Sequence, residues 1–170
     1  MKNLEIKAKC IDHSAAITAL RKLNAEYNGI LKQRDVYFKV SPGRLKLRSV
    51  NGVEHQLIYY RRPDKKSARY SNYFLEKVKY PEETEKLLSD SLGKLVTVNK
   101  KRILYIYENV RIHLDTVRTL GKFIEIEVVC RNENESKTAA GKMRMLIKAL
   151  GLKRKDNLGN SYSDMLLKKK

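Results

Sequence analysis

The chain has 170 residues, enough for one domain with a substantial buried core, and its lysines and arginines outnumber aspartates and glutamates by 37 to 19. The formal net charge of +18 at pH 7 therefore favours a negatively charged substrate or partner. No apolar run approaches the ~20 residues that span a bilayer, and Met1 leads directly into a predicted charged strand rather than a signal peptide, so we expect a cytoplasmic protein with no membrane partner.

Most of the sequence alternates between polar and apolar residues with a period of two, which is typical of β-strands. This pattern predicts eight strands, over residues 2–10, 30–40, 43–49, 54–63, 69–79, 95–107, 109–118 and 122–131. Turn-forming pairs such as Asn51-Gly52 and Leu120-Gly121 separate several strands. Neighbouring strands are therefore expected to pair antiparallel.

Three stretches change to the spacing of an amphipathic helix, over residues 14–27, 82–92 and 136–150. A further short amphipathic helix is predicted over 161–167, before the terminal lysines. Each helix is expected to cover one patch of the sheet. Because no linker or internal repeat divides the sequence, we expect a single domain over residues 1–170.

Several strands are charged along one whole face. In the first strand, Glu5 and Lys7 share a face because side chains alternate along a strand, and Leu4 and Ile6 share the other face. The same alternation gives charged faces to four later strands, through Arg44, Lys46 and Arg48, through Lys100 and Arg102, through Arg111, His113 and Asp115, and through Glu125 and Glu127.

Two arrangements fit these charged faces. They can be the solvent faces of an open antiparallel sheet packed on helices. Alternatively, they can line the lumen of a closed barrel whose apolar faces lie outward beneath the helices. In a closed barrel the end strands meet, so Glu5, Glu125 and Glu127 would cluster. Carboxylates bind a cation such as Mg²⁺, whereas lysine and arginine neutralise phosphate, and phosphoryl-transfer chemistry needs both.

A set of motifs with specific order and spacing covers nearly the whole chain: Asn-Leu-Glu-Ile-Lys at 3–7, Gln33-x-Asp35-x-Tyr37-Phe38, Gly43 to Arg48, Tyr60-Arg-Arg-Pro63, Lys101-Arg102, and Arg111 to Asp115 continuing to Leu120-Gly121 and Glu127. This set resembles the CYTH family, or triphosphate tunnel metalloenzymes, which include class IV adenylyl cyclases, thiamine triphosphatases and inorganic tripolyphosphatases. In that family the first strand carries Glu-x-Glu-x-Lys, so Glu5 and Lys7 match and Asn3 replaces the first glutamate. The Asn-x-Glu-x-Lys form is similar to the branch named after class IV adenylyl cyclases.

The resemblance implies an α+β fold in which an eight-stranded antiparallel β-barrel with a charged lumen, the triphosphate tunnel, is flanked by helices. It implies Mg²⁺ or Mn²⁺ as cofactor, bound by Glu5, Glu125 and Glu127. It implies catalytic roles for Lys7, Arg102 and Asp115. It also implies that the triphosphate is bound by Lys7, Lys46, Arg48, Arg61, Arg69, Lys100 and Arg102.

The register of two of these residues decides whether they point inward. Arg61 and Lys100 would turn outward after a slip of one residue. Asn3 can coordinate a cation through its amide oxygen but adds no negative charge, so a weaker metal site is expected. His113 is interpreted as a lining residue, or as a hydrogen-bond partner near Asp115, rather than as a catalytic base. No serine or cysteine is paired with a histidine and an acid, so covalent catalysis is not expected.

Three functions remain as alternatives. The first is hydrolysis of a nucleotide, organic or inorganic triphosphate with the help of a divalent cation. The second is an adenylyl cyclase reaction that converts ATP to cyclic AMP and pyrophosphate. The third is a non-catalytic binder of polyphosphate or nucleic acid, which the net charge permits. Nucleic acid is the less favoured partner, because carboxylates share the faces that a phosphate backbone would approach and no nucleic-acid-binding motif is found. A small-molecule triphosphate is the expected partner, and the oligomeric state stays open.

Overall fold

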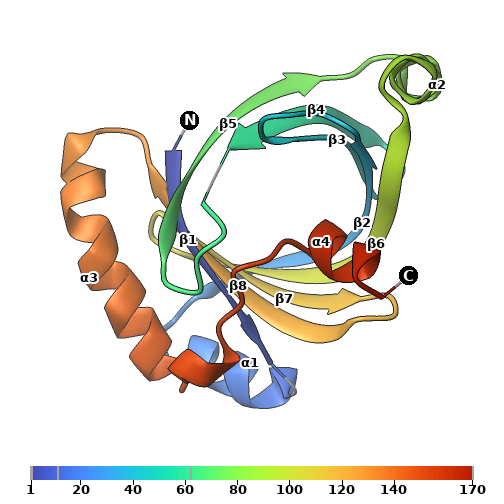
Figure 1. The fold of residues 1–170 in the computed structure, drawn as a ribbon. Coiled ribbons are helices and arrows are strands. Elements are labelled where there is room, and N and C mark those ends of the chain that lie inside the picture. The colour runs from blue at the N-terminus through green and yellow to red at the C-terminus, as the bar shows by residue number, and fades with distance from the viewer. Residues whose placement is uncertain (1, 11, 62, 170) are drawn as a thin grey trace.

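The computed structural model describes residues 2–10, 12–61 and 63–169, and its strands form a closed antiparallel β-barrel (Figure 1). Around the barrel the strands follow the order β1-β5-β4-β3-β2-β6-β7-β8. Their bounds are β1 (Lys2–Lys9), β2 (Glu26–Phe38), β3 (Arg44–Val50), β4 (Glu54–Arg61), β5 (Arg69–Lys77), β6 (Lys94–Tyr107), β7 (Val110–Val117) and β8 (Gly121–Cys130). The predicted eight-stranded barrel with flanking helices is thereby confirmed.

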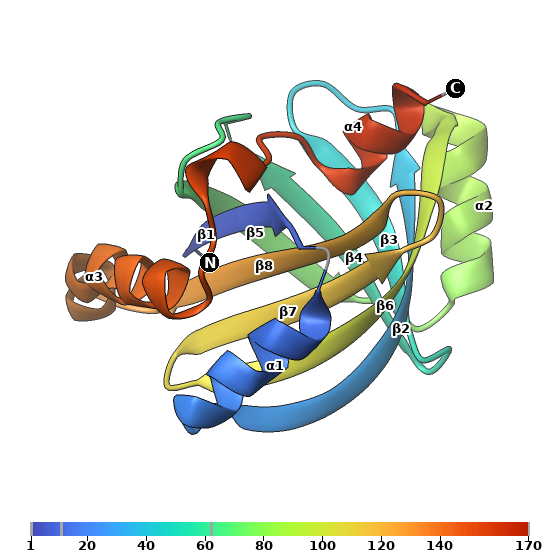
Figure 2. The same cartoon turned by 90° about the horizontal axis from the view of Figure 1, so that it is seen from below.

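Four α-helices and one 3₁₀ turn accompany the described strands: α1 (His13–Lys22), α2 (Pro81–Leu92), α3 (Glu133–Ala149), η1 (Arg154–Asp156) and α4 (Tyr162–Leu167). Figure 2 shows α1 beneath β7, while α3 runs along the outside of the barrel near β8. The helix α4 begins with a capping box between Ser161 and Asp164, which fixes its first turn. Within the described residues, no helix is long and apolar enough to cross a membrane.

The first predicted helix was too long. The sequence predicts a helix over 14–27, but α1 ends at Lys22, and Glu26 and Tyr27 already belong to β2. Asn24 has a positive φ of 55°, a left-handed conformation that asparagine tolerates and that commonly ends helices. The spacing of apolar residues alone does not reveal such a change in backbone conformation. Residue 62, within the predicted strand 54–63, lies outside the described residues.

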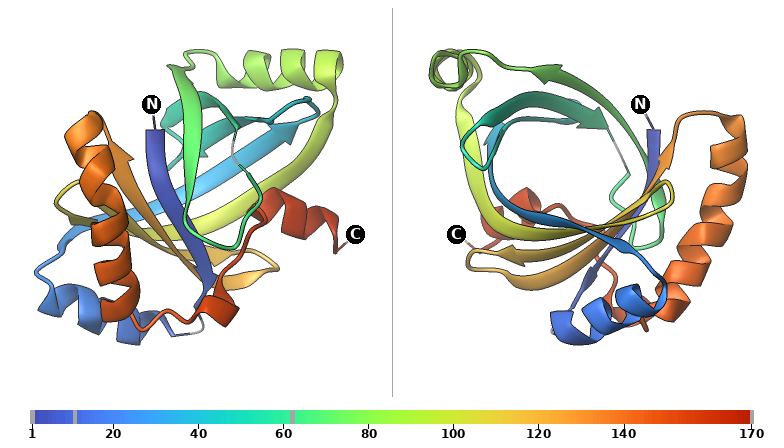
Figure 3. Two further views of the ribbon diagram at one scale, coloured as in Figure 1. Left: turned by 60° about the vertical axis from the view of Figure 1, so that its left-hand side comes forward. Right: turned by 180° about the vertical axis from the view of Figure 1, so that it is seen from behind.

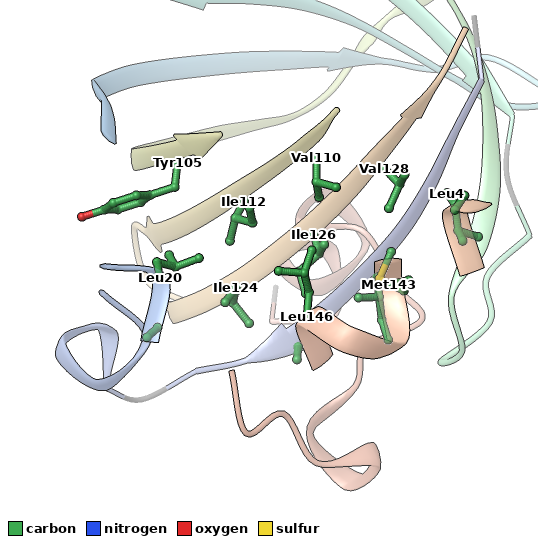
Figure 4. Close-up of a cluster of buried hydrophobic side chains, with 14 of the residues drawn as sticks. Leu4, Leu20, Tyr105, Val110, Ile112, Ile124, Ile126, Val128, Met143 and Leu146 are labelled. Atoms are coloured by element: carbon green, nitrogen blue, oxygen red, sulfur yellow. The ribbon is translucent and has the colours of Figure 1, made fainter. Parts of the chain in front are cut away.

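The largest apolar core lies outside the barrel wall, not inside it. The outward side chains Ile112, Ile124 and Ile126 are almost completely buried beneath the helices. Leu20 of α1 and Leu146 of α3 pack against them in the same cluster (Figure 4). Because strand side chains alternate, the charged residues of these strands must point into the lumen. The closed-barrel interpretation therefore replaces the open-sheet one.

The helix α4 lies across part of one end of the barrel. In Figure 1 it lies in front of the barrel opening, and from behind, in Figure 3, it lies beyond the strands. Its Tyr162 ring packs at 5.0 Å between centroids against the Phe123 ring. Val98 and Val117 belong to the same apolar cluster. This apolar layer forms a floor beneath the charged part of the barrel.

Candidate functional site

A cavity of about 370 Å³ occupies the lumen, and residues of all eight strands and of the α4 segment line it. Its charged lining consists of Glu5, Lys7, Lys46, Arg48, Lys100, Arg102, Arg111, Glu125 and Glu127. The charged faces of strands far apart in sequence therefore meet in one space.

Strand register brings opposite charges together at the junction of β1, β7 and β8. Lys7 and His113 both lie opposite Glu125, and Glu5 and Arg111 both lie opposite Glu127. Lys7 Nζ is 3.1 Å from Glu125 Oε1, and Arg111 Nη2 is 3.1 Å from Glu127 Oε2. Each carboxylate on β8 thus has a cation beside it, as cross-strand pairing favours.

Asp115 lies beneath the lining and holds Arg102 in place. The Asp115 side chain is completely buried and accepts hydrogen bonds from Arg102 Nε at 2.6 Å and Nη2 at 2.7 Å, and from the Tyr162 hydroxyl at 2.9 Å. Burial favours the neutral acid, but the charges of Arg102 and Lys100 outweigh it and lower the pKa of Asp115. Arg102 also donates to Glu125 Oε2 at 2.8 Å. The geometry makes Asp115 a positioning group for Arg102.

Asp35 has the same arrangement on the other side of the barrel. It is 1% exposed and accepts from Lys46 Nζ at 3.0 Å, and from Arg48 Nε at 2.7 Å and Nη2 at 2.8 Å. The paired hydrogen bonds fix the plane of the Arg48 guanidinium. Burial opposes ionisation, but Arg48 and Lys46 hold the pKa of Asp35 well below its usual range. Two buried aspartates therefore orient cations that face the cavity.

Lys100 is buried and forms only a long ion pair with Asp115. Its Nζ lies 3.8 Å from Asp115 Oδ2, beyond hydrogen-bond distance. Burial and the nearby charge of Arg102 lower the pKa of Lys100 to about 7. An anion in the cavity would favour its protonated form.

His113, Glu125 and Glu127 form a group that fits a divalent cation. One ligand atom from each lies within 4.8 Å of the others. His113 Nδ1 is buried, has no hydrogen-bond partner in the described part of the chain, and lies 3.8 Å from Glu125 and 3.7 Å from Glu127. Burial, followed by the charge of Arg102, lowers the pKa of His113 and favours the neutral imidazole that binds metals.

The other residues predicted to bind metal lie next to this group. Glu5 lines the cavity opposite Glu127, and its Oε1 is 3.8 Å from Arg69 Nε. Asn3 also lines the cavity, and with its amide oxygen turned towards Arg111 it accepts a hydrogen bond from Nη2 at 3.0 Å.

Two predicted triphosphate-binding residues, Arg61 and Arg69, are not among the residues that line the cavity. Arg61 is exposed and lines a separate pocket beside Pro63 and Tyr70. Arg69 is buried and donates hydrogen bonds to the carbonyl oxygens of Lys65 and, at 3.1 Å, Leu158. These contacts join Arg69 to the loop before β5 and to the C-terminal segment. The other members of the predicted set, on β1, β3 and β6, converge on the cavity.

Sequence reasoning missed four contributors to the site. Asp35 and Arg111 were recognised only as parts of motifs or faces. His113 was expected to line the lumen, as it does, or to bond near Asp115, but its grouping with Glu125 and Glu127 was not foreseen. The alternation in β7 already places Arg111 and His113 on the inner face. Tyr162 gave no signal, because its role depends on where α4 returns to the barrel.

The comparisons with known proteins agree with this geometry. The sequence profile of the CYTH domain matches residues 1–162, so the chain belongs to the CYTH domain family. A Methanocaldococcus jannaschii protein that is provisionally named an adenylate cyclase is 24% identical over 174 residues, covering 97% of this chain and 98% of that protein.

Two solved structures illustrate the range of similarity. The PH1012 protein of Pyrococcus horikoshii superposes with a TM-score of 0.83 at 27% identity, covering 95% of this chain and 98% of that one. A Hippeastrum protein, provisionally named an adenylyl cyclase and described as having a dominant triphosphatase activity, superposes with a TM-score of 0.66 at 15% identity, covering 99% and 96% of the two chains. The latter likeness concerns the fold alone.

Proposed function

We propose that this chain hydrolyses a triphosphate that it binds in the barrel lumen together with a divalent cation. The observation that carries the proposal is the convergence of Lys46, Arg48, Lys100 and Arg102 on the same cavity as the His113, Glu125 and Glu127 group. Cationic side chains suit phosphate oxygens, and the carboxylate-imidazole group suits a cation. Phosphoryl transfer depends mainly on such positioning and charge stabilisation.

The charges of the lumen support joint binding of triphosphate and cation. Six cationic side chains line the cavity, and three lining carboxylates plus the buried Asp35 and Asp115 oppose them, which leaves a net charge near +1. A triphosphate carries more negative charge than this excess neutralises. A divalent cation held by His113, Glu125 and Glu127 would supply the missing positive charge and help to orient the attacking water.

The protein's own side chains then have separate tasks. Arg48, fixed by Asp35, and Arg102, fixed by Asp115, bind phosphate oxygens in set orientations. In this structure Glu125 forms ion pairs with Lys7 and Arg102. Phosphate oxygens bound in the lumen would compete with Glu125 for these two cations. Lys100, with a pKa of about 7, can hold or release a proton beside the transferred group near neutral pH. Tyr162, at the start of α4, bounds the lumen behind the phosphates and donates a hydrogen bond to Asp115.

We further propose that residues 1–170 form one domain, and that this domain acts on a small-molecule triphosphate in the cytoplasm.

The experiment incubates the purified protein with ATP, thiamine triphosphate and inorganic tripolyphosphate, with Mg²⁺ or Mn²⁺, and separates phosphate, pyrophosphate and cyclic AMP. We expect phosphate release that Glu125→Ala abolishes and that Glu76→Ala, at an exposed position on β5, leaves unchanged. Tight triphosphate binding without turnover would replace hydrolysis with a binding function.

A second function, adenylyl cyclase activity, is favoured by the name of the M. jannaschii relative, which covers nearly the whole chain. In that reaction the ribose 3′-hydroxyl attacks the α-phosphorus and pyrophosphate leaves. Cyclic AMP in equal amount to pyrophosphate, lost in Glu125→Ala, would assign this reaction instead.

A further inference from the structure

Most of the protein's positive charge lies outside the lumen. The formal net charge is +18, whereas the cavity lining and the two buried aspartates together carry a net charge near +1. Part of the excess is concentrated in one segment, because residues 137–155 include seven basic residues and no acidic one. Six of the seven are exposed, namely Lys137, Arg144, Lys148, Lys153, Arg154 and Lys155. In the part of the chain that the structure describes, none of these six forms an ion pair.

Three of these cations form a row along the outer face of α3. Because an α-helix turns once in about 3.6 residues, Lys137, Arg144 and Lys148 share one face, with Gly141 between the first two. The opposite face, which includes Met143, is buried against the barrel. In Figures 1 and 3 α3 stands at the edge of the molecule, and none of the described elements covers its outward side. The row is roughly 16 Å long and open to a partner.

Gly141 lies within this row although the helix itself does not require a glycine there. The residue is exposed in the interior of α3, and its φ is not among the positive values. A Cβ added at Gly141 would meet no described atom within 4 Å, so packing does not call for glycine either. Glycine inside a helix is destabilising relative to alanine. Its missing side chain does, however, let a ligand approach the helix backbone closely.

The chemistry of this face favours a nucleic-acid duplex among large anionic partners. A duplex presents a dense, regular array of phosphates that lysine and arginine bind. Single strands are typically held by aromatic side chains, and α3 contains none. A membrane surface requires apolar residues beside the cations, but Met145 is the one large apolar side chain of α3 that is strongly exposed. A second copy of the chain would bring two cationic faces together.

We propose that the outer face of α3 docks on the phosphate backbone of a nucleic-acid duplex. Lys137, Arg144 and Lys148 contact phosphates, and Gly141 marks the point of closest approach. Contacts to phosphates carry no sequence information, so binding does not depend on the base sequence. The carboxylates that disfavour nucleic acid line the lumen, on the other side of the barrel wall. The inference is therefore independent of the proposed function, and the lumen stays open to the triphosphate.

The test measures binding of a fluorescently labelled DNA duplex of about 20 base pairs by anisotropy, over a series of salt concentrations. The main variant combines Lys137→Gln, Arg144→Gln and Lys148→Gln, because glutamine keeps the helix propensity. Loss of three phosphate contacts should reduce the slope of log affinity against log salt concentration by about 3, and weaken binding at least about tenfold at ~0.1 M salt. Triphosphate hydrolysis should not change.

Two further variants separate the α3 face from net charge and from folding. The matched control combines Lys32→Gln, Lys77→Gln and Lys101→Gln, which removes the same charge from exposed strand positions. It should keep the duplex affinity within about threefold, because salt screens distant charges. Gly141→Gln adds a side chain without a charge. It should weaken duplex binding several-fold while raising the melting temperature, since glutamine favours the helix.

Equal losses in the two triple variants would overturn the inference, because binding would then follow net charge rather than α3. Unchanged duplex affinity in the α3 triple variant would overturn it as well, and unchanged affinity in Gly141→Gln would remove the role of that glycine. Wild-type binding to vesicles of phosphatidylcholine and phosphatidylserine, without duplex binding, would assign the face to a membrane instead. Absence of triphosphate hydrolysis in the wild type would contradict the proposed function alone.

Discussion

The two sides of the barrel use the same strand pattern but differ in what covers them. On β1, β7 and β8 the outward faces are buried beneath α1 and α3, and Leu114 and Ile126 are fully buried. On β5 the outward Phe74 is 72% exposed. Both sides nevertheless present polar residues to the lumen. The alternation of polar and apolar side chains thus forms the lumen on both sides. The covering helices determine which side contributes most to the free energy of unfolding.

The buried aspartate beneath the lumen gives the largest expected effect on stability. Asp115→Ala would leave Arg102 and Lys100 without their counter-charge, which should lower the free energy of unfolding by about 3–5 kcal/mol. Urea unfolding measures this change. Asp90→Ala is the control, because its ion pair with Lys86 is exposed, and it should cost less than about 0.5 kcal/mol. Similar losses in both variants would show that the lumen network contributes no special stability.

The covered side should be sensitive to cavities that leave the site untouched. Leu146→Ala on α3 removes a fully buried side chain from the outer core and should cost about 3 kcal/mol. Triphosphate binding per folded molecule should not change. Phe74→Ala on the uncovered side is the matched control and should cost less than about 1 kcal/mol. A larger loss for Phe74→Ala would reverse the comparison.

Lys100 should make binding depend on pH. Its pKa of about 7 lies below the usual lysine value of 10.5, so it loses its proton near neutrality in the folded protein and only near pH 10.5 in the unfolded chain. The unfolded state therefore binds more protons between these values, and the contribution of Lys100 to stability rises with pH across that window.

Triphosphate binding should show the opposite trend. Because only the protonated amine attracts phosphate, the ratio of wild-type to Lys100→Met affinity should fall about tenfold between pH 6 and pH 8. Calorimetry at several pH values measures the ratio. The corresponding ratio for Arg48→Met should stay constant, because a guanidinium remains charged. A flat ratio for Lys100 would mean that this lysine stays protonated throughout.

The smallest expected effect concerns Asn3, where the family has a glutamate. Asn3→Glu adds a carboxylate to the lining close to Arg111 and near the metal-binding group. The Mg²⁺ concentration that gives half-maximal activity should fall several-fold, since an added carboxylate strengthens a hard-cation site. Asn72→Glu, at an exposed position on β5, should leave it unchanged. An unchanged metal dependence in Asn3→Glu would place the cation elsewhere.

Much of the fold follows from the sequence because each strand carries its own alternation. The period of two predicted β1 and β8, and it put Glu5 on the polar face of β1 and Glu125 and Glu127 together on the polar face of β8. It could not choose between an open sheet and a closed barrel, because both bury the apolar face and differ only in the pairing of β1 with β8. The resemblance to the CYTH family supplied that choice.

The details that sequence reasoning missed depend on long-range contacts. Arg61 faces outward because it follows Tyr60, which lines the lumen, and its partner on β5, Asn72, is exposed as well. Tyr162 reached Asp115 only through the path of the C-terminal segment. The lowered pKa of Lys100 arises from burial and from Arg102, which strand patterns do not measure.

The most direct test of the lumen as the binding site is a crystal structure with a non-hydrolysable ATP analogue and Mn²⁺. We predict the phosphates within hydrogen-bond distance of Lys46, Arg48 and Arg102, and a manganese anomalous peak beside His113, Glu125 and Glu127. An analogue bound to the basic outer surface, with the lumen free of phosphate and manganese, would contradict the account.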